Sequence, residues 1–232
     1  MPEPIQEMQC LRDTTKYSTL NVDGAKILEE AKMLIHSEIS KHKYNYIFLY
    51  LFYVNDIETI CKSSMASRNT WYTERRYRIT GSRIYDIFTY KGMDWVSKSD
   101  RYFNPKSFTN KFVEHGLEHE PTAKQCLKED LKCNLIEVGL AVVSHSNPWL
   151  GYSPDGIVVQ SGDNVLLEVK CPFLGASKSI DEVLPTLSYL VKQGKQYFLR
   201  KKHKYYGQIQ LGMSMLNLEL CYFMIFCSYN KR

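Results

Sequence analysis

Two carboxylates and one ammonium group are spaced so that a short hairpin brings them together. Asp155 follows a proline, and Glu168 stands two residues before Lys170. Side chains alternate faces along a strand, so Glu168 and Lys170 point the same way. The intervening SGDN sequence at 161–164 is rich in turn formers, and a hairpin folded there places Asp155 alongside Glu168. The sequence therefore predicts all three charged groups on a single surface.

This trio suits the binding of a hard divalent cation. Two close carboxylates raise each other's pKa unless a cation lies between them. Mg²⁺ prefers oxygen ligands and keeps several waters, so one or two carboxylates suffice, and the bound ion polarises a phosphoryl oxygen. A neighbouring lysine can orient a water or stabilise developing negative charge. The alternative is an exposed hairpin with a surface Glu–Lys pair, which is common on strand faces.

The hairpin sequence also resembles a known signature. SPDG at 153–156 and LEVKCPF at 167–173 are similar to the PD-(D/E)xK nucleases, in particular to the YqaJ/lambda-type alkaline exonuclease branch, the viral recombinases. The resemblance implies an α/β restriction-endonuclease-like core, with a central mixed β-sheet flanked by helices. It assigns metal binding to Asp155, Glu168 and the Val169 carbonyl, and water activation to Lys170.

A second stretch, WYTERRYRITGS at 71–82, combines arginines with a predicted helix start near Thr80. Free N–H groups at a helix start and nearby arginines favour an anion. A capped helix with solvated arginines is the alternative. The stretch resembles the N-terminal motif of the same exonucleases, which implies that Arg75 and Ser82 hold the 5′ phosphate of DNA and that Thr80 caps the helix. Gly81 replaces the alanine usual in that motif.

The stretch HGLEHE at 115–120 allows two interpretations. The His-x-x-Glu-His order matches an inverted zinc-protease string, but Gly116 and Pro121 disfavour the long regular helix that such a site needs. The spacing of Gly116, Glu120 and Ala123 instead resembles the exonuclease motif, which implies that Glu120 is a third active-site carboxylate. In this interpretation Pro121 lies in the first turn of a helix that ends near residue 132. Alternatively, Glu120 is a solvated residue at a helix start.

A further pair of glutamines lies near the start of a predicted helix at Tyr205. The spacing of Gln208 and Gln210 resembles the exonuclease Y-x-x-Q-x-Q motif, which places Gln208 in the active site. A basic run with interleaved aromatic residues precedes it at 192–206. Such a mixture suits phosphates and unstacked bases, although a solvated charged face is the alternative.

The remaining patterns predict the elements that position these residues. Apolar spacing predicts helices at 21–37 and 57–66, which we assign to an N-terminal helical extension over residues 1–66. The nuclease domain is expected over residues 67–232. Within it, helices are expected at 107–126 and 179–190, and strands at 135–143 and 218–227.

Composition narrows the function classes. The net charge is +5, and residues 71–232 carry 22 Lys and Arg against 16 Asp and Glu, which suits a polyanion. Seven scattered cysteines without a CxxC pair favour reduced thiols in an intracellular, nuclear or cytoplasmic protein. The N-terminus lacks a secretion signal, and the apolar run Tyr46–Val54 is too short to span a bilayer, so no membrane partner is expected.

Together these motifs predict a Mg²⁺-dependent DNA exonuclease, with Mn²⁺ able to substitute. By resemblance it resects double-stranded DNA ends 5′→3′ and releases 5′-nucleotides in recombination or repair. The resemblance also implies a homo-oligomer, namely a trimer, and a single-strand-annealing protein partner. Two alternatives stay open: a structure-specific or restriction-like endonuclease, and a non-cleaving DNA-binding relic of the nuclease fold.

Overall fold

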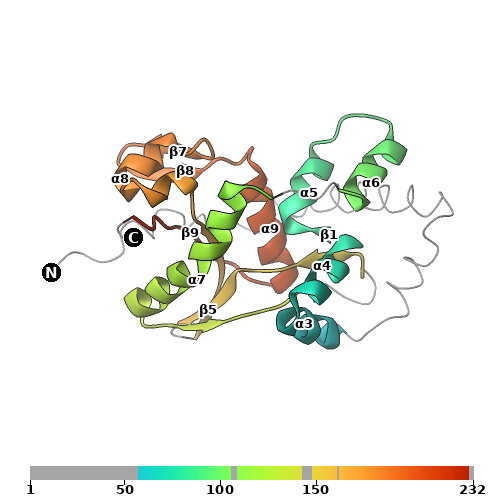
Figure 1. Cartoon of the computed structure of the whole chain (residues 1–232), viewed down its shortest axis with the longest axis horizontal. Coiled ribbons are helices and arrows are strands. Elements are labelled where there is room, and N and C mark those ends of the chain that lie inside the picture. Colours follow the sequence, from blue (N-terminus) through green and yellow to red (C-terminus); the bar gives the residue numbers. More distant parts are fainter. Residues whose placement is uncertain (1–56, 106–108, 143–147, 161, 230–232) are drawn as a thin grey trace.

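The structure is a computed structural model, and it describes residues 57–105, 109–142, 148–160 and 162–229 (Figure 1). The helix expected at 21–37 and the apolar run Tyr46–Val54 lie outside these residues. In the described part of the chain, no helix is long and apolar enough to cross a membrane.

A four-stranded mixed sheet forms the centre of the fold. Its order is β2-β5-β6-β9, with β5 and β6 paired as an antiparallel hairpin and β9 added parallel to β6. The strands are β2 (Asn134–Ile136), β5 (Gly156–Gln160), β6 (Asp163–Lys170) and β9 (Cys221–Ile225). The predicted fold class, a restriction-endonuclease-like α/β core with a mixed sheet, is confirmed.

Helices cover both faces of this sheet (Figure 1). On one face, Val165, Leu167 and Val169 of β6 pack with Ala123 and Leu127 of α7 (Lys111–Leu131). On the other face, Leu166 packs with Ile209 and Met213 of α9 (Lys204–Leu216). Full burial of each such side chain contributes about 1.5–3 kcal/mol. The alternation therefore directs Glu168 and Lys170 toward α9.

A smaller sheet, of order β1-β4-β3, joins the central sheet to the N-terminal helices. Its strands are β1 (Ile79–Thr80), β4 (Leu150–Tyr152) and β3 (Ala141–Val142), and the helices are α3 (Ile57–Ala66), α4 (Arg68–Arg76) and α5 (Gly81–Phe88). Ile60 of α3 packs with Leu140 and Val142, so the end of the expected extension contacts the core. Helix α5 packs closely against α9.

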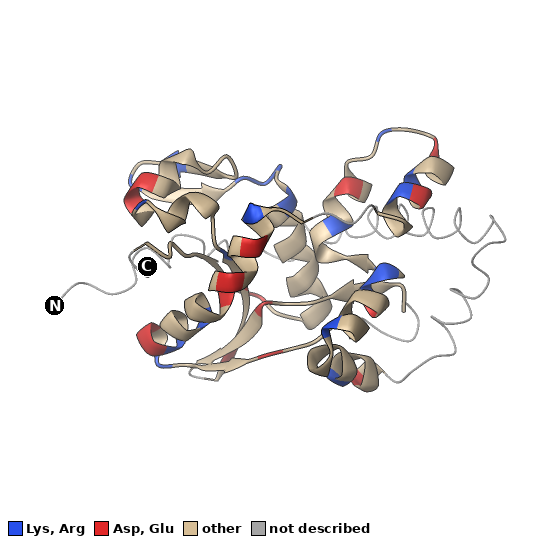
Figure 2. Cartoon of the chain, in the orientation of Figure 1, with Lys and Arg blue, Asp and Glu red and all other residues tan. Residues whose placement is uncertain are grey.

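Short elements complete the described chain. They are α6 (Trp95–Phe103), η2 (Phe173–Ala176), α8 (Ile180–Val183), η3 (Leu184–Thr186), β7 (Leu190–Gln193) and β8 (Gln196–Leu199). The strands β7 and β8 form a hairpin that carries part of the basic run. Figure 2 shows further basic residues on the loop between β8 and α9.

Four predicted elements are wrong in extent. The helix at 107–126 and the helix starting at Pro121 are one continuous helix, α7, because the burial of His115, Ala123 and Leu127 holds the turns on both sides of the proline. The strand expected at 135–143 divides into β2 and β3, since the Leu140 N–H binds Ser64 Oγ at 2.7 Å instead of continuing the ladder. The helix expected at 179–190 is limited to α8 and η3.

The described cysteines are all free thiols, and Cys10 lies outside the described residues.

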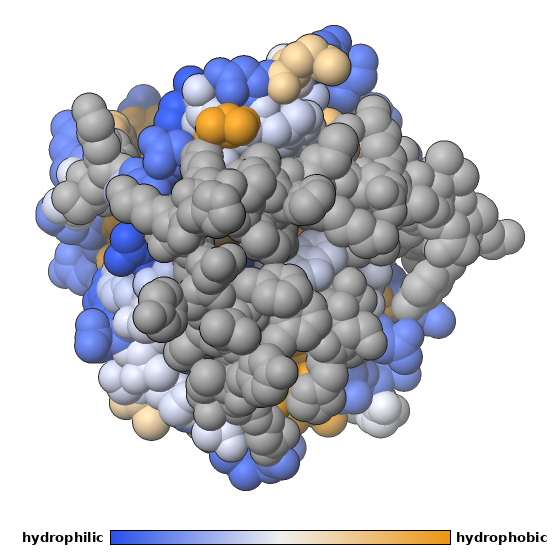
Figure 3. All heavy atoms as spheres, turned by 90° about the vertical axis from the view of Figure 1, so that its right-hand side faces the viewer, coloured by the Kyte–Doolittle hydropathy of each residue, from blue (hydrophilic) through white to orange (hydrophobic). Residues whose placement is uncertain are grey.

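Figure 3 shows the side of the molecule that carries α5 and α6. The visible described surface there is mostly hydrophilic, and apolar residues show only as small separate areas. The core described above therefore lies inside, between the helices and the sheets.

Candidate active site

The β5–β6 hairpin brings Asp155 next to the strand that carries Glu168. Gly156 pairs with Leu167, so Asp155, one residue earlier, lies at the level of Glu168. The turn is possible because Gly162 has a φ of 90°, which other residues rarely adopt. Asp155 Oδ2 accepts a 2.7 Å hydrogen bond from the Val169 N–H. The predicted juxtaposition of the two carboxylates is thus present.

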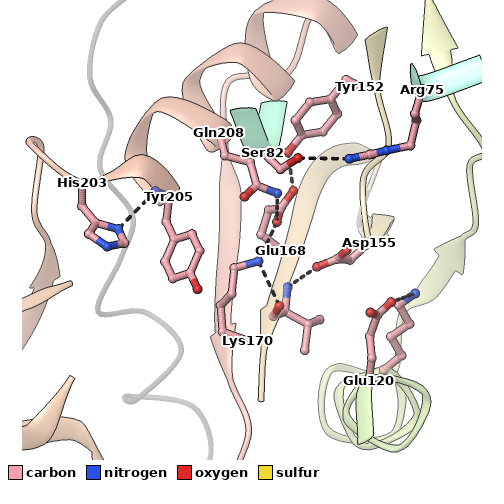
Figure 4. Close-up of polar contacts among 12 residues, drawn as sticks. Arg75, Ser82, Glu120, Tyr152, Asp155, Glu168, Lys170, His203, Tyr205 and Gln208 are labelled. Carbon is pink, nitrogen blue, oxygen red and sulfur yellow. Dashed lines mark hydrogen bonds and ion pairs between the residues drawn. The ribbon is translucent and has the colours of Figure 1, made fainter. Parts of the chain in front are cut away.

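Glu168 is fully buried and is held by three donors from three elements (Figure 4). Its Oε2 accepts from Lys170 Nζ at 3.0 Å and from Gln208 Nε2 at 2.8 Å. Its Oε1 accepts from the hydroxyl of Tyr152. These contacts replace the hydrogen bonds to water that a carboxylate loses when it is buried.

Lys170 lies between the carboxylates and an aromatic wall. Besides Glu168, its Nζ donates to the Val169 carbonyl at 3.1 Å, and it lies 4.9 Å from the ring centroid of Tyr205. Burial disfavours the ammonium form, but the carboxylates of Glu168 and Asp155 outweigh it and raise the pKa of Lys170. The side chain is therefore a fixed positive charge at the end of β6.

The environment of Asp155 favours a cation. Burial, followed by the Glu168 carboxylate, raises the pKa of Asp155 to about 7, although the ammonium of Lys170 opposes this shift. A nearby cation favours the ionised form of a carboxyl group whose pKa is raised in this way.

Glu120 approaches the same place from α7. It lies in the middle of the helix, not at its start, and forms an ion pair with Lys124 at 2.6 Å. Its charge contributes to raising the pKa of Asp155, which places it close enough to act on the same site.

The residues of the second motif contact one another and line the same cavity as Asp155. Arg75 donates to Ser82 Oγ at 3.0 Å, and its guanidinium lies 4.1 Å from the ring centroid of Trp71. Trp71 Nε1 in turn donates to Ser153 Oγ at 2.8 Å, which ties α4 to the hairpin. Thr80 occupies the N-cap position of α5, but its side chain makes no capping hydrogen bond. The expected side-chain cap is therefore not formed.

One cavity of about 460 Å³ joins these groups. Among the predicted site residues, its lining includes Arg75, Ser82, Glu120, Asp155 and Gln208. Glu168 lies behind this lining, in contact with Gln208 and Tyr152. Gln210 lines a different, smaller cavity of about 50 Å³, so the two glutamines of the motif separate.

The donor set fits a hard divalent cation. It consists of oxygen atoms from the Asp155 and Glu168 carboxylates and the Val169 carbonyl. Mg²⁺ and Mn²⁺ accept such oxygen ligands together with waters. In the described residues, no group of three or more His, Cys, Asp and Glu side chains could hold a metal ion. The rings of His115 and His119 lie 4.3 Å apart on α7. Among the described residues they have no third side chain with which to form a zinc site.

Sequence reasoning missed two residues of this site. Tyr152 and Ser153 both line the cavity, and each binds a residue of a motif. Their position just before Pro154 and Asp155 was the available signal, because the end of a strand that leads into a site lies beside that site. Neither residue type alone indicates a role.

Comparisons with known proteins agree with this architecture. The family described as the YqaJ-like viral recombinase domain matches residues 70–218. The crystal structure of LHK-Exo in complex with dAMP is 23% identical, covers 69% of this chain and 74% of its own, and superposes with a TM-score of 0.50. A crystal structure of the alkaline exonuclease LHK-Exo from Laribacter hongkongensis is 22% identical over 68% of this chain and 73% of its own, with a TM-score of 0.48. No curated protein matches the chain.

Proposed function

The chain belongs to the YqaJ-like viral recombinase family, and on this premise we propose that it is a divalent-metal-dependent DNA exonuclease that resects duplex ends 5′→3′. LHK-Exo, whose fold it shares, is an alkaline exonuclease crystallised with dAMP, a nucleoside 5′-monophosphate. The proposed product of this chain belongs to the same chemical class.

One observation carries the proposal: a cavity that combines acidic and basic groups in separate positions. Its lining includes the carboxylates Asp155 and Glu120 as well as Arg75 and Ser82. A phosphodiester chain needs both, since the scissile phosphate requires a cation and a terminal phosphate requires cationic and hydroxyl donors. A protein that only binds DNA does not need the neighbouring carboxylates of Asp155 and Glu168.

The carboxylates and Lys170 would act on the scissile bond. A divalent cation held by Asp155, Glu168 and the Val169 carbonyl would polarise the phosphoryl oxygen and lower the pKa of an attacking water. Lys170 would hold that water or donate to the phosphoryl oxygens as negative charge grows on them. Gln208 fixes the Glu168 carboxylate through its 2.8 Å hydrogen bond, and Glu120 adds negative charge that favours the cation.

Arg75 and Ser82 would hold the 5′ phosphate of the strand being shortened. Burial lowers the pKa of the Arg75 guanidinium, and its partner Ser82 is uncharged, so an anion bound there gains a charge-assisted hydrogen bond. Cleavage that breaks the bond between phosphorus and the 3′ oxygen leaves a new 5′ phosphate on the shortened strand. Each cycle therefore regenerates the group that this pocket binds.

The basic run before α9 supports contact with the remaining DNA. Lys201 and Lys202 lie in the turn before α9, and Lys204 is the first residue of that helix. The ring centroid of the next residue, Tyr205, lies 4.9 Å from Lys170 Nζ. Positive charge along this path would neutralise phosphates. The proposed setting is the interior of a cell, in recombination or repair. The trimer and the annealing-protein partner remain predictions from the resemblance.

Duplex DNA labelled at one end tests the direction. A 5′-labelled, 5′-phosphorylated duplex incubated with Mg²⁺ should release its label at once as a mononucleotide, whereas a 3′ label should appear late and in short fragments. Early release of the 3′ label would reverse the proposed direction. Release of long labelled fragments from both substrates would indicate internal cutting, which is the endonuclease alternative.

A further inference from the structure

We infer that Tyr152 is a positioning residue that fixes the Glu168 carboxylate in the orientation needed for a divalent cation. The inference rests on the proposed function, because it concerns the same metal site. Lys170 and Gln208 both bind Oε2 of Glu168, whereas the Tyr152 hydroxyl donates to Oε1 (Figure 4). Tyr152 thus holds the oxygen that the other two donors do not contact.

The ring of Tyr152 is held in a slot that only glycines permit. Its side chain is 1% exposed and lies between α5 and α9. A Cβ at Gly81 of α5 would lie 2.5 Å from the ring, and a Cβ at Gly212 of α9 would lie 2.2 Å from it. Both distances are far below van der Waals contact, so each helix approaches the ring at a glycine. The hydroxyl therefore has little freedom to leave Glu168.

The two helices around this slot also carry other site residues. Ser82 follows Gly81 on α5, and Gln208 lies one turn before Gly212 on α9. The ring is consequently the spacer between the phosphate-pocket helix and the helix that bears Gln208. A packing contact made only for stability has no need to end on the buried carboxylate of the site.

The hydrogen-bond count explains why the hydroxyl matters. An ionised carboxylate offers about four lone-pair sites, and three donors occupy three of them on Glu168. Donors on both oxygens fix the plane of the carboxylate and leave room for one further ligand. The Tyr152 side chain is 1% exposed, and its hydroxyl donates to Oε1. Without the hydroxyl, Oε1 is free to rotate away.

Supporting partners of this kind typically change metal affinity by about 10–100-fold. The test is the full chain carrying Tyr152→Phe, titrated with MgCl₂ without DNA and followed by the rise in melting temperature. Phenylalanine keeps the ring in its slot, so we expect a metal-free melting temperature within a few degrees of the wild type. We expect the Mg²⁺ midpoint to move up by about 10-fold or more. An unchanged midpoint would show that Tyr152 only packs.

A matched control and a second variant make the result specific. Tyr222→Phe also removes one hydroxyl, which lies 3.5 Å from Gln160 Oε1 in the other part of the sheet, and should leave the Mg²⁺ midpoint unchanged. Gly212→Ala keeps the Tyr152 hydroxyl but displaces the ring, so as a single substitution it should weaken Mg²⁺ binding. Combined with Tyr152→Phe, it should weaken binding no further than Tyr152→Phe alone. Additive losses from the two changes would contradict a shared route through Glu168.

The failure of the proposed function is distinguishable from the failure of this inference. If the wild-type chain shows no shift with MgCl₂ or MnCl₂, the proposed metal site itself is wrong. If the wild type responds and Tyr152→Phe responds at the same concentration, only the role of Tyr152 is wrong.

Discussion

Asp155 Oδ2 and the backbone nitrogen of Val169 are 2.7 Å apart, and this hydrogen bond closes the open end of the β5–β6 hairpin. It ties the residue before β5 to the strand that carries Glu168 and Lys170. The same carboxylate is therefore both a structural clasp and, in the proposed function, a ligand of the cation. A substitution that keeps the clasp and removes the charge separates these two roles.

Asp155→Asn makes that separation, because the amide oxygen can still accept from Val169. We expect the rate of Mg²⁺-dependent cleavage of linear duplex DNA to fall by about 100-fold or more. The reason is that the bound cation would stabilise the transition state by several kcal/mol, and this stabilisation is lost. The melting temperature should stay close to that of the wild type. Asp163→Asn changes a carboxylate at the turn end of the same hairpin and serves as the control. Equal activity of wild type and Asp155→Asn would remove Asp155 from the site.

Arg75→Ala should abolish the preference for phosphorylated 5′ ends. The loss of a hydrogen-bonded charge partner corresponds to about 1.5–3 kcal/mol, or roughly 10–100-fold, and only the phosphorylated substrate should suffer it. Initial rates on duplexes with 5′-phosphate and 5′-hydroxyl ends measure the effect. The neighbouring Arg76→Ala is the control, since Arg76 is exposed and contacts Asn104 at 3.5 Å. A proportional loss on both substrates would contradict a phosphate pocket at Arg75.

Mg²⁺ affinity should rise with pH through neutrality. The pKa of Asp155 is raised to about 7, so below that pH a proton occupies the carboxylate and competes with the cation. Between pH 6 and pH 8 the ionised fraction of such a group grows by about 10-fold, and the apparent affinity should grow by a similar factor. Titrations with MgCl₂ at the two pH values, read by melting temperature, measure it. Equal midpoints would show that Asp155 is ionised throughout or is not a ligand.

Arg78→Met should destabilise the fold. Arg78 is 1% exposed and donates to the Glu74 side chain, to the Glu74 carbonyl at 2.8 Å and to the Pro148 carbonyl at 2.9 Å. Removing it takes away the guanidinium that donates to the buried Glu74 carboxylate, which costs about 3–5 kcal/mol. Urea unfolding should show this loss, and Arg76→Ala should show almost none. A near-normal free energy of unfolding for Arg78→Met would mean that Glu74 finds water or another donor.

The sequence located the hairpin and its charged residues because they depend on local rules. Alternation along a strand, turn residues at Gly162 and the spacing of Glu168 and Lys170 need no knowledge of the rest of the chain. The face assignment of Val165, Leu167 and Val169 follows from the same rule, and the packing against α7 confirms it.

The features that local sequence rules could not predict depend on contacts between distant segments. Arginines 75, 76 and 78 look alike in the sequence, yet Arg75 lines the cavity, Arg76 is exposed and Arg78 is buried against Glu74. Pro121 signals a helix start, but the tertiary burial of α7 carries the helix past it. The role inferred for Tyr152 depends on Gly81 and Gly212, which are far apart in sequence and meet only in the fold.

The most direct test of the account is the digestion of linear, 5′-phosphorylated duplex DNA beside the same DNA as a covalently closed circle, with Mg²⁺ and with EDTA. We predict loss of the linear form alone, only with Mg²⁺, and release of mononucleotides. Asp155→Asn should spare both forms. Cutting of the circle would assign an endonuclease, and intact DNA of both forms under Mg²⁺ and Mn²⁺ would contradict the proposed activity.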